Sequence, residues 1–141
     1  MTEDNFEKFI EELQRKIEYE EERKYSKAVI KEYRNPNNFC DLKNSDSYGK
    51  IKGPCGDTMK ISLKIDNNKI TDAYFWTDGC GATIACGSMI TKMVKGINMD
   101  KAANITSDNL TNALDGLPDE NLHCSKLVIN ALKKAIKNYK K

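Results

Sequence analysis

The stretch MKISLKIDNNKITDAYFWT, residues 59–77, decides the fold. Apolar residues occupy every second position of its first half, at Met59, Ile61, Leu63 and Ile65. This period of two is typical of a strand with one buried face. The turn residues Asp66-Asn67-Asn68 follow, and residues 70–77 are rich in aromatic and β-branched side chains. The segment therefore predicts a β-hairpin, antiparallel because the connection is short.

The sequence on either side of the hairpin predicts a third strand and several helices. Residues 48–52 are a candidate strand, and residues 3–34 have helical spacing up to the stop at Asn35-Pro36. After the hairpin we expect a helix that ends at Gly96, a short helix around residues 108–114, and a final helix that Pro118 opens. The predicted class is α+β, a three-stranded antiparallel sheet with helices packed on one face.

Composition excludes several classes of protein. The 141 residues fit one domain, and 39% hydrophobic with 31% charged residues describe a water-soluble globular chain. With 23 basic and 21 acidic residues the net charge is +2, which argues against nucleic acid as the main partner. No apolar run approaches the length of a membrane span. The Glu-rich N-terminal segment resembles neither a secretory signal nor a transit peptide, so we expect a cytoplasmic protein without a membrane partner.

Five cysteines carry the functional signal. The odd count and the reducing cytosol argue against a disulfide framework, and no CxxC pair is present. Cys55 lies in a GPCGD loop (residues 53–57) before the first hairpin strand, and Cys80 lies in DGCG (residues 78–81) after the second. Because the hairpin reverses the chain, both cysteines should lie at the same end of the sheet.

A second group of candidate ligands comes from the last helix. His123 and Cys124 fall in its first turn, where a helix N-terminus lowers a thiol pKa and favours the thiolate. Three thiolates, the carboxylate of Asp57 and an imidazole make a ligand set for a thiophilic metal or an iron–sulfur cluster. An oxygen or nitrogen ligand leaves one iron more easily displaced, which suits transfer rather than electron carriage.

Simpler interpretations exist for the single residues. Cys86 is most simply a buried small hydrophobe, and Cys40 has no glycine neighbours and is most simply incidental. His123 could be a capping or core histidine, and Asp57 a turn residue. The placement of all five candidates at junctions between elements favours a site.

These segments resemble a known family. GPCGD (residues 53–57), Gly79-Cys80-Gly81 and His123-Cys124-Ser125 are similar to the three signature segments of the IscU/NifU family of iron–sulfur scaffolds. YSKAVIKEYRNP (residues 25–36) resembles the opening helix of that family, and MVKG (residues 93–96) resembles the end of its post-cysteine helix. The resemblance divides the chain into an N-terminal helical extension, 1–24, and a scaffold domain, 25–141.

The resemblance implies a binding and transfer protein, not an enzyme. Such a scaffold takes sulfur from a cysteine desulfurase and iron from a donor, builds a [2Fe–2S] cluster, and passes it to apo iron–sulfur acceptor proteins. The implied ligands are Cys55, Cys80 and Cys124, with Asp57 and His123 as exchangeable or assisting ligands. Zinc is known to occupy the same pocket in the family.

Departures from the family pattern bear on partners and on alternatives. Where one branch has Leu-Pro-Pro-Val-Lys for a dedicated Hsp70 chaperone, this chain has Leu117-Pro118-Asp119-Glu120-Asn121, which speaks against that interaction. The main alternative function is a zinc-dependent sulfurtransfer protein that accepts persulfide sulfur; a stable electron carrier is a third. The zinc branch has an insertion before its third cysteine and usually lacks the histidine, and this chain has neither feature.

Residues 1–24 have no counterpart in short family members. Phe6, Phe9, Ile10 and Leu13 form a stripe that predicts an amphipathic helix. We expect it to dock on its own domain or on a second copy in a homo-oligomer, because so much apolar area is costly to leave in water. The alternative is a frayed charged tail.

Overall fold

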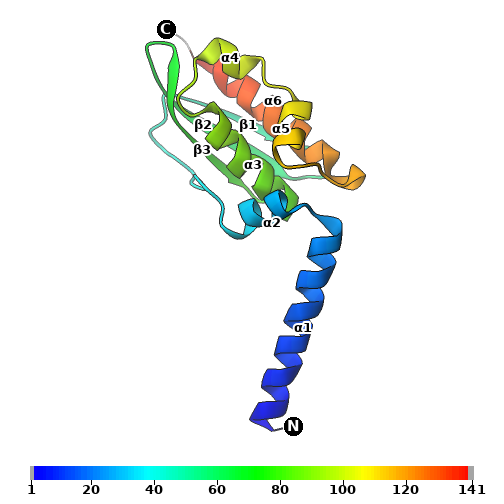
Figure 1. Ribbon diagram of the computed structural model, residues 1–141. Coiled ribbons are helices and arrows are strands. Elements are labelled where there is room, and N and C mark those ends of the chain that lie inside the picture. Colours follow the sequence, from blue (N-terminus) through cyan, green and yellow to red (C-terminus); the bar gives the residue numbers. More distant parts are fainter. Residues whose placement is uncertain (1, 140–141) are drawn as a thin grey trace.

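The computed structural model describes residues 2–139, and its centre is a three-stranded antiparallel sheet in the order β1-β2-β3 (Figure 1). The strands are β1 (Ser47–Lys52), β2 (Thr58–Asp66) and β3 (Lys69–Thr77). In the hairpin, Ile61 lies opposite Phe75 and Met59 lies opposite Thr77. The predicted hairpin and third strand are confirmed.

The hairpin turn explains the two asparagines. Asn67 and Asn68 have φ angles of 50° and 63°, in the left-handed region. A two-residue turn of this hand matches the twist of the flanking strands, and Asn tolerates the conformation better than most residues. The turn therefore sets the pairing next to it, Asp66 with Lys69 and Ile65 with Ile70, and an irregularity between Lys64 and Ile65 shifts the register of the rest of the hairpin.

Helices α3 (Gly81–Val94) and α6 (Leu122–Asn138) cover one face of the sheet (Figure 1). The core between them and the strands is fully buried and includes Met59, Ile61, Leu63, Phe75, Ala85, Ile90, Val128 and Leu132. Helix α6 approaches β1 so closely that a Cβ atom at Gly49 would lie 2.3 Å from the carbonyl oxygen of Ala131. The two helices that carry Cys80 and Cys124 are thus fixed against the sheet.

The connection between α3 and α6 differs in detail from the prediction. It contains α4 (Met99–Ala103), which was not expected, and α5 (Ser107–Ala113), which was. Pro118 does not open the last helix: it precedes the 3₁₀ turn η1 (Asp119–Asn121), and α6 begins at Leu122. The proline is extended, with φ −56° and ψ 148°, so its fixed φ serves the short turn rather than the helix.

The predicted helix over residues 3–34 is broken in two. Helix α1 (Glu3–Lys24) and helix α2 (Lys27–Arg34) meet at Tyr25 and Ser26, which are extended. The Ser26 hydroxyl accepts from the Val29 N–H and donates to the Leu114 carbonyl. The helix breaks here because serine is more favourable as an N-cap than inside a helix. Helix α2 then packs on α3 (Figure 1).

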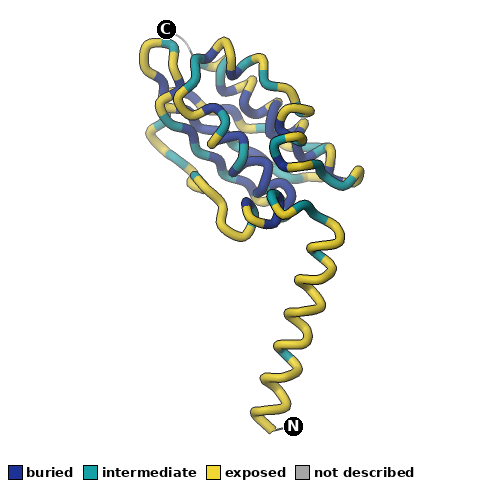
Figure 2. Tube along the Cα trace, in the orientation of Figure 1, coloured by how far each residue is buried: buried dark blue, intermediate teal, exposed yellow. Residues whose placement is uncertain are grey.

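Helix α1 projects away from the domain and buries none of its residues (Figure 2). Its apolar stripe does not dock on its own domain, so that half of the expectation is wrong. Only the base of the helix is tied down, through ion pairs from Glu21 to Arg34 at 2.6 Å and from Lys24 to Glu120 at 2.7 Å. None of the helices described between residues 2 and 139 is long and apolar enough to cross a membrane.

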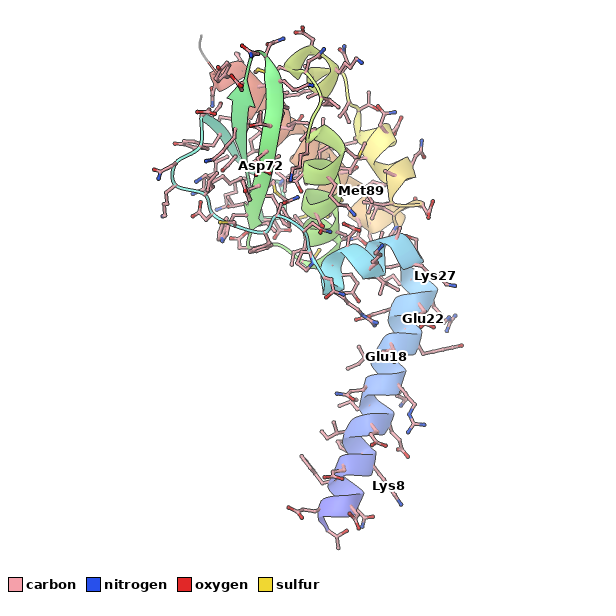
Figure 3. The ribbon with its side chains drawn as sticks, turned by 60° about the vertical axis from the view of Figure 1, so that its left-hand side comes forward. Lys8, Glu18, Glu22, Lys27, Asp72 and Met89 are labelled. Carbon is pink, nitrogen blue, oxygen red and sulfur yellow. The ribbon has the colours of Figure 1, made fainter. Side chains whose placement is uncertain are left out.

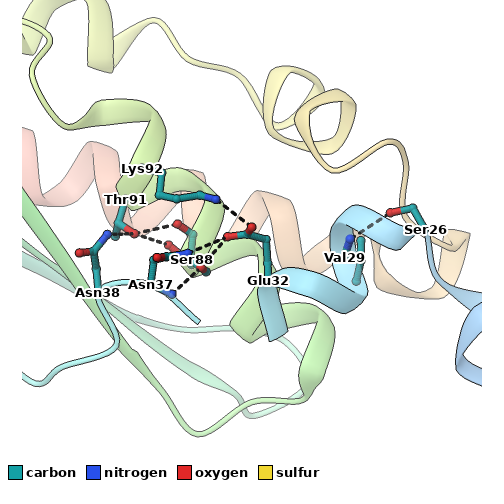
Figure 4. A network of polar contacts seen from close by, with 9 residues as sticks. Ser26, Val29, Glu32, Asn37, Asn38, Ser88, Thr91 and Lys92 are labelled. Atoms are coloured by element: carbon teal, nitrogen blue, oxygen red, sulfur yellow. Dashed lines mark hydrogen bonds and ion pairs between the residues drawn. The ribbon is translucent and has the colours of Figure 1, made fainter. Parts of the chain in front are cut away.

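A polar network fixes α2 and the following segment on α3 (Figure 4). The buried carboxylate of Glu32 accepts from the Ser88 hydroxyl at 2.7 Å and pairs with the Lys92 ammonium at 2.8 Å. Burial raises the pKa of Glu32, but the hydrogen bonds and the charge of Lys92 outweigh it and leave the pKa below its ordinary value. Beside it the Asn38 amide donates to the Thr91 hydroxyl at 3.1 Å. The network makes α3 a rigid support for the residue at its N-terminus, Cys80.

Candidate functional site

The loops that carry Cys55 and Cys80 lie side by side at one end of the sheet, as the hairpin predicts. The backbone N–H of Thr58 donates to the Asp78 carboxylate at 2.7 Å, and the Thr77 hydroxyl donates to the Thr58 carbonyl at 2.6 Å. These bonds join the start of β2 to the end of β3. Cys55 stands three residues before Thr58, and Cys80 three residues after Thr77.

Cys80 is the N-cap residue of α3, and its thiol is exposed. Partial burial raises the pKa of this thiol, but hydrogen bonds from Thr83 and from the Ala82 backbone favour the thiolate and outweigh it. The pKa of Cys80 is therefore below its ordinary value, as expected for a sulfur at the N-terminus of a helix.

Thr83 connects the two cysteines and was not anticipated from the sequence. Its side chain is fully buried, and its hydroxyl lies 3.6 Å from the sulfur of Cys80 and donates to the sulfur of Cys124 at 3.3 Å. A Cβ atom at Gly79 would lie 2.9 Å from the Thr83 side chain, so the glycine makes room for this threonine. The available signal was a hydroxyl residue three positions after Cys80, where a helix brings side chains onto one face.

Cys124 lies in the first turn of α6, as predicted, but its thiol behaves differently from the prediction. The residue is fully buried. Burial raises the pKa of Cys124 to about 11; the hydrogen bond from Thr83 opposes this, and the neighbouring charge of Cys80 adds to it. The expectation that the helix N-terminus makes Cys124 a thiolate is wrong, because desolvation of the charged form is the larger effect.

His123 adjoins this pair. It is half-buried, and its Nε2 atom lies 3.7 Å from the sulfur of Cys124. Cys80, Thr83, Cys124 and His123 thus form one connected group at the N-termini of α3 and α6, which we call the built half of the site. Cysteine sulfur and imidazole nitrogen are donor types that thiophilic metals and iron–sulfur clusters accept.

Cys55 and Asp57 occupy the adjacent loop, which we call the open half of the site. The Gly53 N–H donates to the Asp57 carbonyl at 2.7 Å, and Gly56 takes a φ of 86° to close the turn. Cys55 is exposed and Asp57 half-buried. Within residues 2–139, no three side chains of His, Cys, Asp or Glu are close enough together to hold a metal ion. The five predicted ligands share one end of the sheet without forming a closed cage.

Comparison with known families decides the relationship. The family described as the NifU-like N terminal domain matches residues 24–141. The chain belongs to this family. The match includes all five predicted ligands and leaves almost all of α1 outside.

Several similar proteins are named iron–sulfur cluster assembly scaffold proteins. One of two iron–sulfur cluster assembly scaffold proteins IscU of Archaeoglobus fulgidus is 42% identical over 82% of this chain and 76% of its own length. The protein of the same name from Escherichia coli K12 is 41% identical over 82% of this chain and 94% of its own length. A solved NifU-like N-terminal structure from Brucella abortus has a TM-score of 0.62 and 19% identity, and covers 81% of this chain and 92% of that one. The last comparison supports the fold alone.

The two remaining cysteines of this NifU-like domain lie in different environments. Cys40 is exposed, and its N–H donates to the Phe75 carbonyl at 2.9 Å, so the segment covers the edge of β3. Cys86 is fully buried in α3 within the apolar core, which confirms that it packs as a small hydrophobe. Burial raises the pKa of Cys86 far above its ordinary value, with smaller contributions from the charges of Cys124 and Cys80.

Proposed function

We propose that this chain is a scaffold on which a [2Fe–2S] cluster is assembled and from which it is passed to apo-proteins. Iron and sulfide are the substrates, and Cys55, Cys80 and Cys124 are the proposed thiolate ligands, since such clusters are held mainly by cysteine sulfur. Asp57 and His123 are the proposed exchangeable ligands. In this role the chain binds and transfers; it does not turn over a substrate as an enzyme does.

One observation carries the proposal: the buried Thr83 hydroxyl links the sulfurs of Cys80 and Cys124, and His123 lies 3.7 Å from the second sulfur. The adjacent loop presents a third thiol, on Cys55. A metalloprotein with a permanent structural ion closes its ligand cage completely. Here the described residues supply the built half and the open half of the site, an arrangement that would permit a cluster to be loaded and released. The names of the IscU relatives support the same function.

The proposed partners follow from this chemistry. Sulfur comes from the persulfide of a cysteine desulfurase: the Cys80 thiolate, favoured by its lowered pKa, attacks the outer sulfur, and the desulfurase thiolate leaves. An electron donor such as a thiol reductant then reduces the transferred sulfur to the sulfide of the cluster. An iron donor supplies the metal, and apo iron–sulfur proteins in the cytoplasm receive the cluster. Within residues 117–121, the turn η1 (Asp119–Asn121) pairs with α1 through Glu120 and Lys24, and we propose no dedicated Hsp70 contact there.

Anaerobic reconstitution with iron, cysteine, a cysteine desulfurase and a thiol reductant tests the proposal. We expect the visible absorption of a [2Fe–2S] centre with about two irons and two sulfides per site. The control variant is Cys40→Ser, which removes an exposed thiol outside the site and should assemble normally. Tight binding of zinc with persulfide on a cysteine, and no cluster, would instead identify the zinc-dependent sulfurtransfer protein.

A further inference from the structure

The longest surface without an assigned role is the apolar stripe of α1. The large side chains Phe6, Phe9, Leu13 and Ile17 are 56%, 53%, 45% and 49% exposed, and Ile10 lies between them. Helix α1 projects away from the domain and buries none of its residues (Figure 3). In proteins an amphipathic helix gains most of its stability from packing its apolar face. The stripe therefore needs a partner.

The spacing of the stripe is that of a coiled-coil seam. Phe6, Ile10, Leu13 and Ile17 are separated by four, three and four positions, which are the d, a, d and a positions of two heptads. Charged side chains fill most of the outward positions, among them Lys8, Glu11, Arg15, Glu18 and Glu22. Glu20, at the next seam position, ends the apolar run. The pattern favours another helix as the partner over a flat surface.

The seam is also complementary to itself when reversed. An antiparallel copy aligned at the centre of the stripe places Phe6 against Ile17 and Ile10 against Leu13, so all four layers are apolar. Such a match of a surface with its own copy is what a two-fold interface requires. No outside helix is needed to complete these layers.

The helix dipoles favour the antiparallel arrangement. Antiparallel pairing opposes the two dipoles, whereas parallel pairing would align them. The apolar seam has four layers and ends on each side where Glu3 of one copy faces Glu20 of the other. Parallel pairing would also set both domains at the same level beside the helix C-termini.

We infer that α1 binds α1 of a second copy of this chain in an antiparallel two-helix coiled coil. The dimer holds the two domains at opposite ends of a rod about 33 Å long, the length of a 22-residue helix at about 1.5 Å per residue. Each site then faces its partners without obstruction from the other copy. A seam of two heptads is short, so the dimer is reversible and its population rises with concentration.

Sedimentation of the full apo-chain under reducing conditions, over a wide range of concentration, tests this. The reductant excludes disulfide-linked dimers. Leu13→Lys places a charge in the seam and should weaken the dimer by roughly tenfold or more in Kd. The matched control is Glu18→Gln, which adds the same unit of charge on the outer face of the helix and should leave the dimer intact.

A distance measurement fixes the orientation. A nitroxide-bearing residue in place of Glu22, introduced without a cysteine, should show a separation of about 30 Å along the paired helices. A parallel pair would bring the two labels to the same level. A monomer at all concentrations, a dimer that survives Leu13→Lys, a larger oligomer or a short label distance would each overturn the inference. Because the apo-protein is used, these outcomes leave the proposed cluster chemistry untouched.

Discussion

The two halves of the candidate site are built in opposite ways. The built half lies at two helix N-termini, where the buried Thr83 hydroxyl joins the exposed Cys80 to the buried Cys124. The open half is a short turn whose thiol, on Cys55, is exposed and makes no hydrogen bond within residues 2–139. The difference shows that folding already orders some of the ligands, so binding a cluster costs little further conformational entropy there, whereas Cys55 keeps its freedom to move. A site made this way can hold a cluster and still open for an acceptor.

Removing a thiol from either half gives the largest expected effect. Cys55→Ser, Cys80→Ser and Cys124→Ser should each abolish stable cluster binding, while Cys40→Ser and Cys86→Ser should retain it. The halves should differ in stability: Cys124→Ser puts a hydroxyl in a buried position and should lower the free energy of unfolding by about 1–3 kcal/mol, and Cys55→Ser should leave it unchanged. Iron content and urea unfolding of the apo-variants provide the two readouts. Complete loss of the cluster in a folded Cys86→Ser protein would contradict the assignment.

The buried thiol of the built half should make stability fall at alkaline pH. The pKa of Cys124 is about 11 in the folded chain against 9.0 ordinarily, so the folded state holds this proton more tightly. The resulting stabilisation is complete below about pH 9 and is lost between about pH 9 and pH 11, a decrease of about 2–3 kcal/mol. Cys86 acts in the same direction.

Urea unfolding at the two ends of this pH range measures the effect. Lysine and tyrosine titrate there too, so the informative quantity is the difference between the parent chain and Cys124→Ser. The variant should lose less stability on raising the pH, and Cys40→Ser should lose as much as the parent. An identical loss in Cys124→Ser and the parent would show that the buried thiol does not govern the effect.

Removing the Thr83 hydroxyl that links the two sulfurs should have a smaller effect than removing a thiol. Thr83→Val keeps the shape of the side chain and removes the hydroxyl, which should cost about 1 kcal/mol of folding free energy. It should also raise the pH at which Cys80 reacts with an alkylating reagent, since a bond that favours its thiolate is lost. Thr83→Ser retains the hydroxyl and should restore the reaction profile. A Val variant that alkylates like the parent would show that Thr83 only fills space.

Asp57→Ala should give the smallest change, confined to kinetics. A carboxylate oxygen is a weaker partner than thiolate for a cluster iron, and it leaves that iron open to an incoming thiol. We expect a longer-lived cluster and slower transfer to an apo-ferredoxin, followed by visible absorption or circular dichroism. Unchanged or faster transfer would remove Asp57 from the proposed ligand set.

The sequence predicts the sheet better than the connections. The alternation at Met59–Ile65 and the Asn67-Asn68 turn leave few arrangements for β2 and β3. The hairpin could therefore be predicted from the sequence, and with it the location of Cys55 and Cys80 at one end of the sheet. Helix α4, by contrast, has five residues and too few turns to show a period. The break at Ser26 depends on a bond to Leu114, far along the chain, which local spacing does not reveal.

The candidate site shows the same division. The residue types and their junctions identified the five ligands as candidates, but not which thiol has a lowered pKa and which a raised one. That depends on burial, which is a property of the packed chain: Cys124 lies against the core and Cys80 does not. Thr83 was missed because one threonine after a cysteine is unremarkable until a second sulfur from α6 is brought to the same hydroxyl.

Transfer of an assembled cluster tests the central claim most directly. The scaffold is loaded anaerobically with ⁵⁷Fe, separated from free iron and sulfide, and mixed with an apo-ferredoxin in the presence of an iron chelator. A half-built, half-open site predicts that the labelled cluster appears in the ferredoxin faster than the chelator removes iron, and that the scaffold returns to the apo form. Iron that goes to the chelator first, or a cluster that stays on the scaffold and cycles reversibly between oxidation states, would contradict the account.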